Sequence, residues 1–240
     1  MADFIGWRMA GGFVGGVGLL ASMVFWRKLP ASRYFVARPL PFTPAGLAAL
    51  RQAVVTVWRD PGLPWLFAMA FVLMGCFVSL YNYIGFYLEA PPFGLSPSVI
   101  GLIFTLYLVG VVSSVTSGHL AQRFGRSRAM LGLTGAMLCG LVLTLFHTLP
   151  VVIVGAILFT FSFFGGHAIA SGWVGQRSGQ AKALAAAFYM SSYYVGSSLI
   201  GSTSGLFWAS GHWAGVVGVL AVTLVVGLAV IRFRLARLPG

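Results

Sequence analysis

The sequence predicts an all-α membrane protein with about seven transmembrane helices. Three observations support this fold class. Of the 240 residues, 59% are hydrophobic and only 8% are charged, whereas soluble domains contain roughly 25% charged residues. The apolar residues form runs long enough to cross a bilayer, which takes about 20 residues in a helix. The basic residues gather in short clusters between these runs, as they do in membrane loops.

Seven apolar stretches qualify as spans, and short polar turns join most of them. The exception is the link Arg27–Gly62, which is rich in proline and is expected to hold an amphipathic helix near Ala45–Trp58 on the membrane surface. Small residues four apart, such as Gly201 and Gly205, are expected to let helices approach closely, either as static packing or as a sliding surface. The predicted spans are Met9–Trp26, Leu63–Leu88, Val99–Leu120, Ala129–Phe146, Val151–Val174, Leu184–Ala209 and Trp213–Ile231.

The placement of charge predicts an orientation. All of the 15 Lys and Arg residues except Arg8 fall in one set of alternate loops or in the carboxyl-terminal tail. Basic loops stay in the cytoplasm, so the amino terminus is expected outside and the carboxyl terminus in the cytoplasm. The same bias explains the net charge of +12 without a nucleic-acid partner, because the basic residues form no continuous stripe.

Several chemical classes receive no support from the sequence. It contains no H-E-x-x-H, G-x-S-x-G or Walker motif, so we expect neither an enzyme nor an ATPase. Cys76 and Cys139 fall inside apolar runs and are expected to be buried free thiols. No metal or cofactor is therefore expected, and the predicted partners are the lipid bilayer and a small-molecule substrate.

The segment Gly118-His-Leu-Ala-Gln-Arg-Phe-Gly-Arg-Ser-Arg128 is the most specific motif of the chain. It resembles the G-x-L-a-D-R-x-G-R loop of the major facilitator superfamily, a conformational-switch loop, with Gln122 in place of the usual acidic residue. Gly118 is expected to allow close helix packing, and Gly125 a tight reversal. The basic residues of the motif are Arg123, Arg126 and Arg128.

This resemblance implies where the chain belongs in a twelve-helix transporter. The degenerate motif suits the loop between helices 8 and 9, which makes the chain resemble helices 6–12, the carboxyl-terminal half. Residues 1–26 would then be the last helix of the first bundle, 27–62 the central cytoplasmic loop and 63–240 the second six-helix bundle. The remaining helices would come from elsewhere. The closest resemblance is to bacterial drug- or arabinose-efflux permeases of the inner membrane.

The implied function is secondary active transport of a small solute by alternating access, most simply efflux, with proton coupling through His167 or the missing half. Substrates of this fold bind near the bilayer midplane, so polar residues inside the spans are the candidates. His167 would relay a proton or bind substrate, or else be a neutral structural histidine. The candidate substrate-binding residues are Asn82, Tyr83, Tyr107, His167, Tyr189, Tyr193 and Ser197.

Two other classes remain open. A seven-helix receptor or sensor would share the predicted topology, although a retinal version would need a lysine inside a span, and Lys28 and Lys182 both lie in loops. An intramembrane enzyme would need a paired nucleophile and base, and the sequence suggests none.

Overall fold

The computed structural model describes residues 2–30 and 43–238, with side chains omitted for residues 2–7 and 10. The chain divides into two compact units, 1–46 and 47–240, and each is considered by itself. The division falls inside the link predicted over residues 27–62. In the first unit, a single helix, α1 (Ala2–Lys28), covers the first predicted span.

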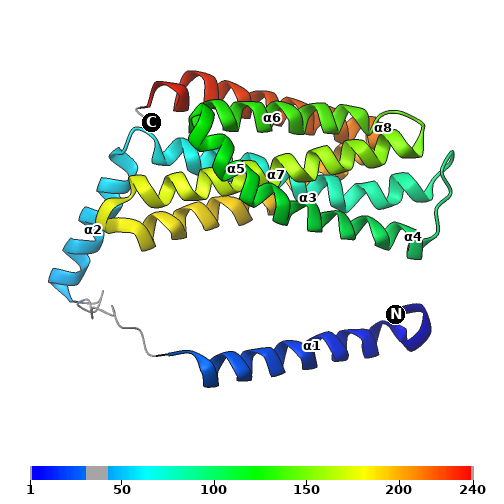
Figure 1. Cartoon of the computed structure of the whole chain (residues 1–240), viewed down its shortest axis with the longest axis horizontal. Helices are drawn as coiled ribbons and strands as arrows, with labels where there is room; N and C mark the ends of the chain where they lie inside the picture. The colour runs from blue at the N-terminus through cyan, green and yellow to red at the C-terminus, as the bar shows by residue number, and fades with distance from the viewer. Residues whose placement is uncertain (1, 31–42, 239–240) are drawn as a thin grey trace. The chain divides into compact units, whose positions relative to one another are not determined.

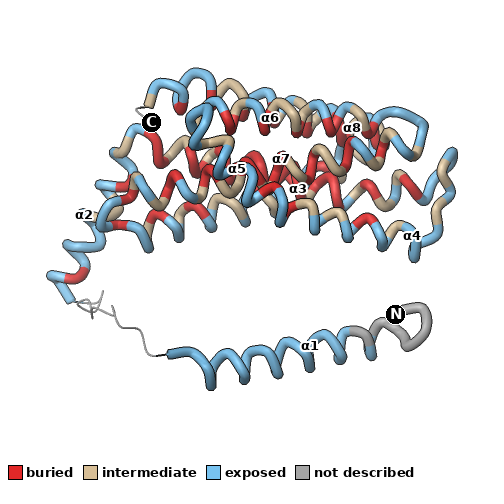
Figure 2. The backbone as a smooth tube through the Cα atoms, viewed as in Figure 1, coloured by how far each residue is buried: buried red, intermediate tan, exposed pale blue. Residues whose placement is uncertain are grey.

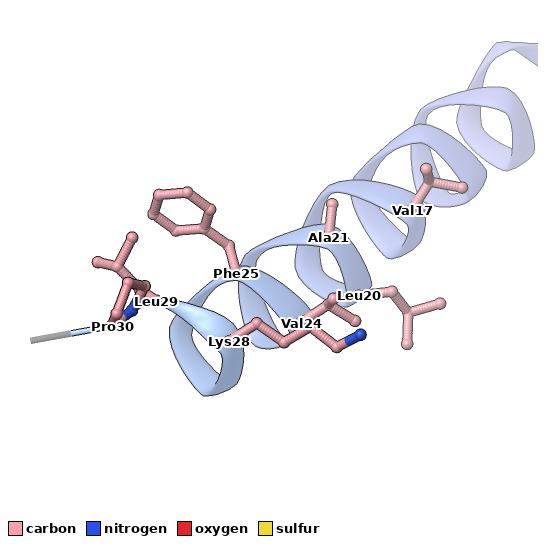
Figure 3. Close-up of a pocket in the computed structure, with 8 residues that line it drawn as sticks. All are labelled: Val17, Leu20, Ala21, Val24, Phe25, Lys28, Leu29 and Pro30. Atoms are coloured by element: carbon pink, nitrogen blue, oxygen red, sulfur yellow. The ribbon is translucent and has the colours of Figure 1, made fainter.

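The described side chains of α1 are exposed, apolar ones included, within their own unit. Near its carboxyl end the helix presents a concave, mostly apolar surface that includes one lysine (Figure 3). All the residues that line this surface belong to α1 or to the two residues that follow it, so the surface is one face of a single helix. Its lining residues are Val17, Leu20, Ala21, Val24, Phe25, Lys28, Leu29 and Pro30.

The second unit is a helical bundle (Figure 1), and a helix covers each of the six remaining predicted spans. The third predicted span is continuous but changes from α-helical to 3-10 geometry and back. In chain order the elements are α2 (Pro44–Arg59), α3 (Leu63–Glu89), α4 (Pro97–Gly101), η1 (Leu102–Leu108), α5 (Val109–Phe124), α6 (Arg126–Leu143), α7 (Leu149–Arg177), η2 (Gly179–Ala181), α8 (Lys182–Phe233) and η3 (Leu235–Arg237).

The long helix α8 contains two spans rather than one. Its backbone leaves helical geometry at His212, where φ is 48° and ψ is −139°. Gly196 before this residue and Gly227 after it both pack beside the same turn of α3, against Phe71 and Val72 respectively. The two arms therefore run antiparallel, and Figure 1 shows the chain travelling along the bundle and returning. This reversal matches the predicted boundary between Leu184–Ala209 and Trp213–Ile231.

Four stretches among the described residues are long and apolar enough to cross a membrane: Leu63–Glu89, Pro97–Phe124, Leu149–Arg177 and Gly179–Arg237. The last of these includes both arms of α8. Helix α6, which has 18 residues and begins with two arginines, is not among the four.

Helices α3 and α7 carry much of the buried surface of the bundle (Figure 2). Helix α3 packs chiefly against α8, and α6 packs against α7. Trp173 and Phe163 on α7 are among the largest fully buried side chains. Cys76 on α3 is buried, as expected, but Cys139 is exposed on the outer face of α6. The expectation for Cys139 was wrong because an apolar run does not tell a core-facing residue from a lipid-facing one.

Glycines set the closest helix contacts. A Cβ atom added at Gly140 of α6 would lie 2.7 Å from the carbonyl oxygen of Gly155 in α7. The predicted pair on α8 packs less tightly on α3: an added Cβ would lie at the ordinary contact distance of 3.5 Å from Val78 at Gly201, and 2.9 Å from the Tyr83 hydroxyl at Gly205. The backbones of α6 and α7 therefore approach at Gly140 and Gly155 to a distance at which larger side chains do not fit.

The basic loops meet at one end of the bundle, called here the basic end. Asp60, just before α3, forms an ion pair with Arg177 at the end of α7. The hydroxyl of Ser127, in the first turn of α6, donates a hydrogen bond to the carbonyl oxygen of Leu235 after α8 (3.1 Å). Because all four residues lie at helix ends, these contacts place the starts of α3 and α6 beside the ends of α7 and α8.

Candidate functional site

A histidine and two tyrosines meet where α7 packs on the first arm of α8. The hydroxyl of Tyr189 lies 3.0 Å from Nδ1 of His167, within hydrogen-bond distance. Tyr193 follows one turn later on α8, and its ring centroid lies 5.0 Å from that of His167. The spacing of four residues puts both tyrosines on one face of α8, so a single stretch of helix positions both rings against the histidine.

This cluster continues as a wall of aromatic rings across α7, α3 and η1. Phe163, four residues before His167, stacks on Phe77 of α3 with a centroid distance of 3.9 Å. Phe77 in turn lies 5.3 Å from Tyr107 of η1, and Tyr107 meets the edge of Tyr81 at 4.8 Å. Four of the seven predicted residues therefore belong to one connected network, called here the aromatic face: Phe77, Tyr81, Tyr107, Phe163, His167, Tyr189 and Tyr193.

The aromatic face is firmly anchored and partly open. Tyr189 is only 2% exposed, and the hydroxyl of Tyr81 lies 2.7 Å from Oγ1 of Thr160. Tyr107 is 38% exposed, and His167 and Tyr193 are half-buried. Aromatic rings bind other rings and cations through their faces. Hydroxyl and imidazole groups add directional hydrogen bonds, so the face can bind an organic solute that has both apolar and polar parts.

Asn82 and Tyr83 lie on another side of α3. Tyr83 donates a hydrogen bond from its hydroxyl to the carbonyl oxygen of Gly201 (3.5 Å), and its ring lies 5.8 Å from that of Trp208. Asn82 is exposed, with its amide also near Gly201. Ser197 donates a hydrogen bond to the carbonyl oxygen of Tyr194 in its own helix (3.0 Å). The structure thus joins Asn82 and Tyr83 to α8, separately from the aromatic face.

Sequence reasoning missed the α3 contribution to the aromatic face. Phe77 and Tyr81 are four residues apart, as are Phe163 and His167, so both pairs carry a helical spacing signal. The spacing of Phe77 and Tyr81 was visible in the sequence, but the predicted site on this span used Asn82 and Tyr83 instead.

The loop motif has the predicted turn but not all of the predicted packing. Helix α5 ends at Phe124 and α6 begins at Arg126, so Gly125 alone makes the reversal with a φ of +85°. That left-handed φ favours glycine. Gly118 has no atom within 4 Å of an added Cβ and lines a cavity of about 460 Å³ with Gln122. Close helix packing therefore does not explain Gly118, contrary to expectation.

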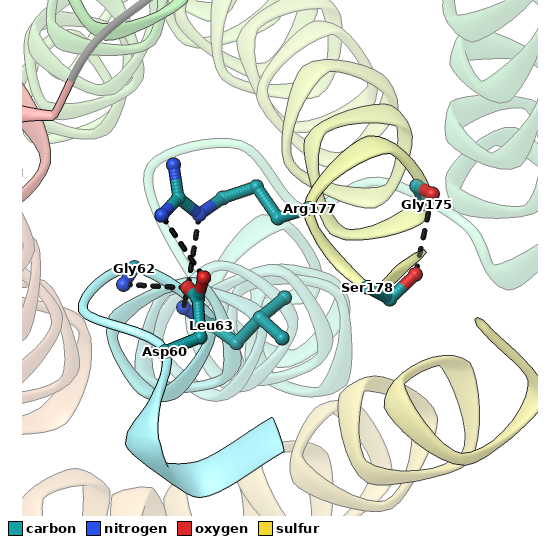
Figure 4. A network of polar contacts seen from close by, with 6 residues as sticks. All are labelled: Asp60, Gly62, Leu63, Gly175, Arg177 and Ser178. Carbon is teal, nitrogen blue, oxygen red and sulfur yellow. Dashed lines mark hydrogen bonds and ion pairs between the residues drawn. The ribbon is translucent and has the colours of Figure 1, made fainter. Parts of the chain in front are cut away.

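Asp60 forms a network at the basic end that sequence reasoning did not identify (Figure 4). One carboxylate oxygen accepts hydrogen bonds from Nε of Arg177 (2.9 Å) and from the backbone N–H groups of Gly62 and Leu63 (both 2.8 Å). The other accepts one from Nη2 of Arg177 (3.0 Å). Burial raises the pKa of Asp60, but these hydrogen bonds outweigh burial and lower that pKa overall.

Comparison with known proteins decides the family. Residues 86–239 match the sequence profile of the Major Facilitator Superfamily. The chain belongs to this superfamily. The predicted membership of the superfamily is therefore confirmed, as is the prediction of an all-helical, multi-pass membrane protein. Membership in the Major Facilitator Superfamily also favours a transporter over the seven-helix receptor.

Bacterial relatives within the superfamily agree with this assignment. Inner membrane transport protein YnfM of Escherichia coli is 43% identical over 228 residues, and the uncharacterized MFS-type transporter YybF of Bacillus subtilis is 39% identical over 228 residues. Each match covers 95% of this chain but only 54% of YnfM and 55% of YybF. The chain thus spans about half the length of the curated relatives it matches.

Solved transporter structures share the fold at low sequence identity. The POT family transporter PepTSo matches 74% of this chain and 38% of its own with a TM-score of 0.65 at 19% identity. A bacterial homologue of the iron transporter ferroportin, in an outward-facing state, matches 91% of this chain and 53% of its own with a TM-score of 0.61 at 17% identity. These likenesses support the fold.

Proposed function

We propose that this chain forms one half of a secondary transporter that moves a small organic solute across the bacterial inner membrane by alternating access. The observation that carries this proposal is the aromatic face. In a member of the Major Facilitator Superfamily, a half-buried histidine and tyrosines between apolar helices mark a binding surface. Polar groups inside a membrane cost free energy, so they occur mainly where they serve a function. We further propose that the solute is exported.

The depth of the aromatic face fits a substrate site. His167 lies on α7 about 15 Å from the helix end at Arg177, at a rise of 1.5 Å per residue. The hydrocarbon core of a bilayer is about 30 Å thick, so we propose that His167 lies near the midplane, where substrates of such transporters bind. His167 is also proposed as the proton carrier, because an imidazole ring can accept a proton at one nitrogen and donate one from the other. The acidic residues with described side chains, Asp60 and Glu89, lie at the two ends of α3.

The proposed orientation puts the basic end in the cytoplasm. Positive charge is retained on that side during membrane insertion, and Arg126, Arg177 and Arg232 all lie there. Helix α2 belongs to the same end: its Trp58 contacts the rings of Phe67 and Phe188 at centroid distances of 6.0 and 5.6 Å. We propose that α2 lies along the cytoplasmic membrane surface and that the remaining residues of the 27–62 segment complete the central loop.

The other half of the solute pathway is proposed to come from further helices that pack as a first bundle with α1. The exposed apolar surface of α1 suits such packing. Asn82, Tyr83 and Ser197 are proposed as secondary contacts to the solute, and the Gly118–Arg128 loop as the segment that changes partners when the transporter changes state.

A two-part transport assay tests this function. The chain is expressed in Escherichia coli with or without the amino-terminal half of YnfM, and efflux of ethidium and of arabinose is followed. Export of either probe is expected only when both parts are present, and His167→Leu is expected to abolish it, whereas Tyr194→Phe, next to the aromatic face, is expected to leave it intact. Export by the chain alone would contradict the two-part proposal, and full export by His167→Leu would contradict the assigned site.

A further inference from the structure

Three arginines line one cavity at the basic end, away from the aromatic face. The cavity has a volume of about 670 Å³ and lies between the start of α6 and the end of α8. Arg126 and Arg128 come from the first turn of α6, and Arg232 comes from the last turn of α8. The hydrogen bond from Ser127 to Leu235 ties the two helix ends together and so maintains the cavity between them.

Among the side chains that the structure describes, no carboxylate balances the charge in this cavity. Among the described residues, the ion pair at the basic end joins Arg177 to Asp60, which leaves no carboxylate for the three arginines of the cavity. Glu89, the other acidic residue with a described side chain, lies at the far end of α3. Gln122 occupies the position at which the superfamily motif usually carries an acid. Neighbouring guanidinium groups repel each other, and a bound anion removes that repulsion.

The apolar surroundings indicate what kind of anion fits. Leu131 and Ile231 line the same cavity as the arginines, and Phe124 on its rim is 50% exposed. A second cavity of about 320 Å³ shares Phe124 and Arg128 with the first, and its other lining residues are Leu120, Ala129, Gly132 and Leu133. A charged pocket therefore shares part of its wall with an apolar groove along α5 and α6. A free phosphate ion would leave this groove unfilled.

We propose that this pair of cavities binds an anionic phospholipid, with the phosphate on Arg126, Arg128 and Arg232 and an acyl chain in the groove beside Gly132. Guanidinium groups bind phosphate oxygens through paired hydrogen bonds. Basic pockets between membrane helices are known to bind anionic headgroups. The bound lipid joins the α5–α6 turn to the end of α8, so it stabilises this end of the bundle. This proposal does not depend on transport or on the identity of the solute.

Lipid binding is measured on the full chain purified in a neutral detergent. Native mass spectrometry counts retained lipid during titration with phosphatidylglycerol or with phosphatidylcholine of the same acyl chains. We expect one tightly retained phosphatidylglycerol and no comparable phosphatidylcholine. Removing one arginine is expected to weaken binding about fivefold, and Arg128→Gln with Arg232→Gln about 25-fold, since each basic residue contributes a similar increment. Arg59→Gln, an exposed arginine on α2 outside the cavity, is the matched control.

Two further arms separate a lipid from a soluble ligand. Gly132→Leu places a larger apolar side chain in the groove and leaves all three arginines unsubstituted; an added Cβ at Gly132 has no atom within 4 Å. It is expected to weaken phosphatidylglycerol retention. Glycerol 3-phosphate, which lacks acyl chains, is expected not to displace the lipid at equal concentration. Equal loss in Arg59→Gln and the cavity variants, or displacement by glycerol 3-phosphate, would overturn the proposal. Unchanged retention in the double arginine variant would also overturn it.

Discussion

The hydroxyl of Tyr189 lies 3.0 Å from Nδ1 of His167 and joins the first arm of α8 to the middle of α7. The same hydroxyl is 3.5 Å from the carbonyl oxygen of His167. Tyr189 is almost fully buried whereas His167 is half-buried. The tyrosine therefore contacts the imidazole from its buried side and fixes the ring at the open side of the aromatic face. Preorganisation of this kind lowers the cost of binding a solute.

The first prediction concerns this pair. We expect Tyr189→Phe and His167→Leu each to destabilise the chain, and the double variant to lose less than the sum, because the two groups share one interaction. The coupling is expected to be about 0.6 kcal/mol, the average for hydrogen bonds between membrane helices. Denaturation in mixed micelles, with Tyr194→Phe as the control on the exposed side of α8, measures it. Strict additivity would show that the two side chains do not interact.

The second prediction concerns the Asp60 network. Asp60→Asn removes the charge that binds Arg177, and we expect it to cost about 2 kcal/mol of unfolding free energy, as for other hydrogen bonds to charged groups. Arg177→Gln should cost a similar amount, and adding it to Asp60→Asn should cost little more. Glu89→Gln replaces an exposed carboxylate at the other end of α3 and is the matched control. A loss in Glu89→Gln as large as that in Asp60→Asn would contradict the specific role of Asp60.

The third prediction follows from the lowered pKa of Asp60. A group with a folded-state pKa below its ordinary value of 3.8 stabilises the fold above that value, and its contribution is lost as the pH falls through the folded-state pKa. The stability difference between the native chain and Asp60→Asn should therefore be constant from neutral to mildly acidic pH and shrink below pH 3.8. Thermal melts across this range measure it. A difference that grows on acidification would reverse the assigned sign.

The fourth prediction tests the close approach of α6 and α7. We expect Gly140→Ala to destabilise the bundle by about 1–3 kcal/mol, the usual cost of overpacking, because the new Cβ would lie 2.7 Å from the Gly155 carbonyl oxygen. Gly132→Ala on the same helix meets no atom within 4 Å and should be neutral or slightly stabilising, since alanine favours a helix. Equal behaviour of the two variants in thermal unfolding would show that α6 and α7 do not approach closely at Gly140.

The helices could be predicted from the sequence because lipid imposes a simple requirement on length and composition. Even the reversal at His212 falls in the predicted gap between Ala209 and Trp213. Burial within the spans could not be predicted in the same way. Lipid-facing and core-facing residues are both apolar. The sequence around Cys139, on the outside of α6, therefore does not differ in character from that around Cys76, in the core.

The candidate site was only partly predictable. Helical spacing put Tyr189 and Tyr193 on one face, and the fold brought His167 and Tyr107 to them. Helical spacing does not determine which neighbouring helix a face contacts. Asn82 and Tyr83 were therefore the predicted site residues of α3, whereas Phe77 and Tyr81 are its residues in the aromatic face. The Asp60–Arg177 pair left no local signal, because its residues are 117 positions apart and only tertiary packing joins them.

Cysteine accessibility tests most directly whether the aromatic face lines a solute pathway. In a cysteine-free background of the chain assembled with the YnfM amino-terminal half in membrane vesicles, Tyr193→Cys and Val225→Cys are treated with a membrane-impermeant maleimide. Tyr193 is half-buried and Val225 is more exposed, so burial alone favours labelling at Val225. The account predicts rapid labelling of Tyr193→Cys from water and none of Val225→Cys in lipid. Labelling of Val225→Cys but not of Tyr193→Cys would contradict it.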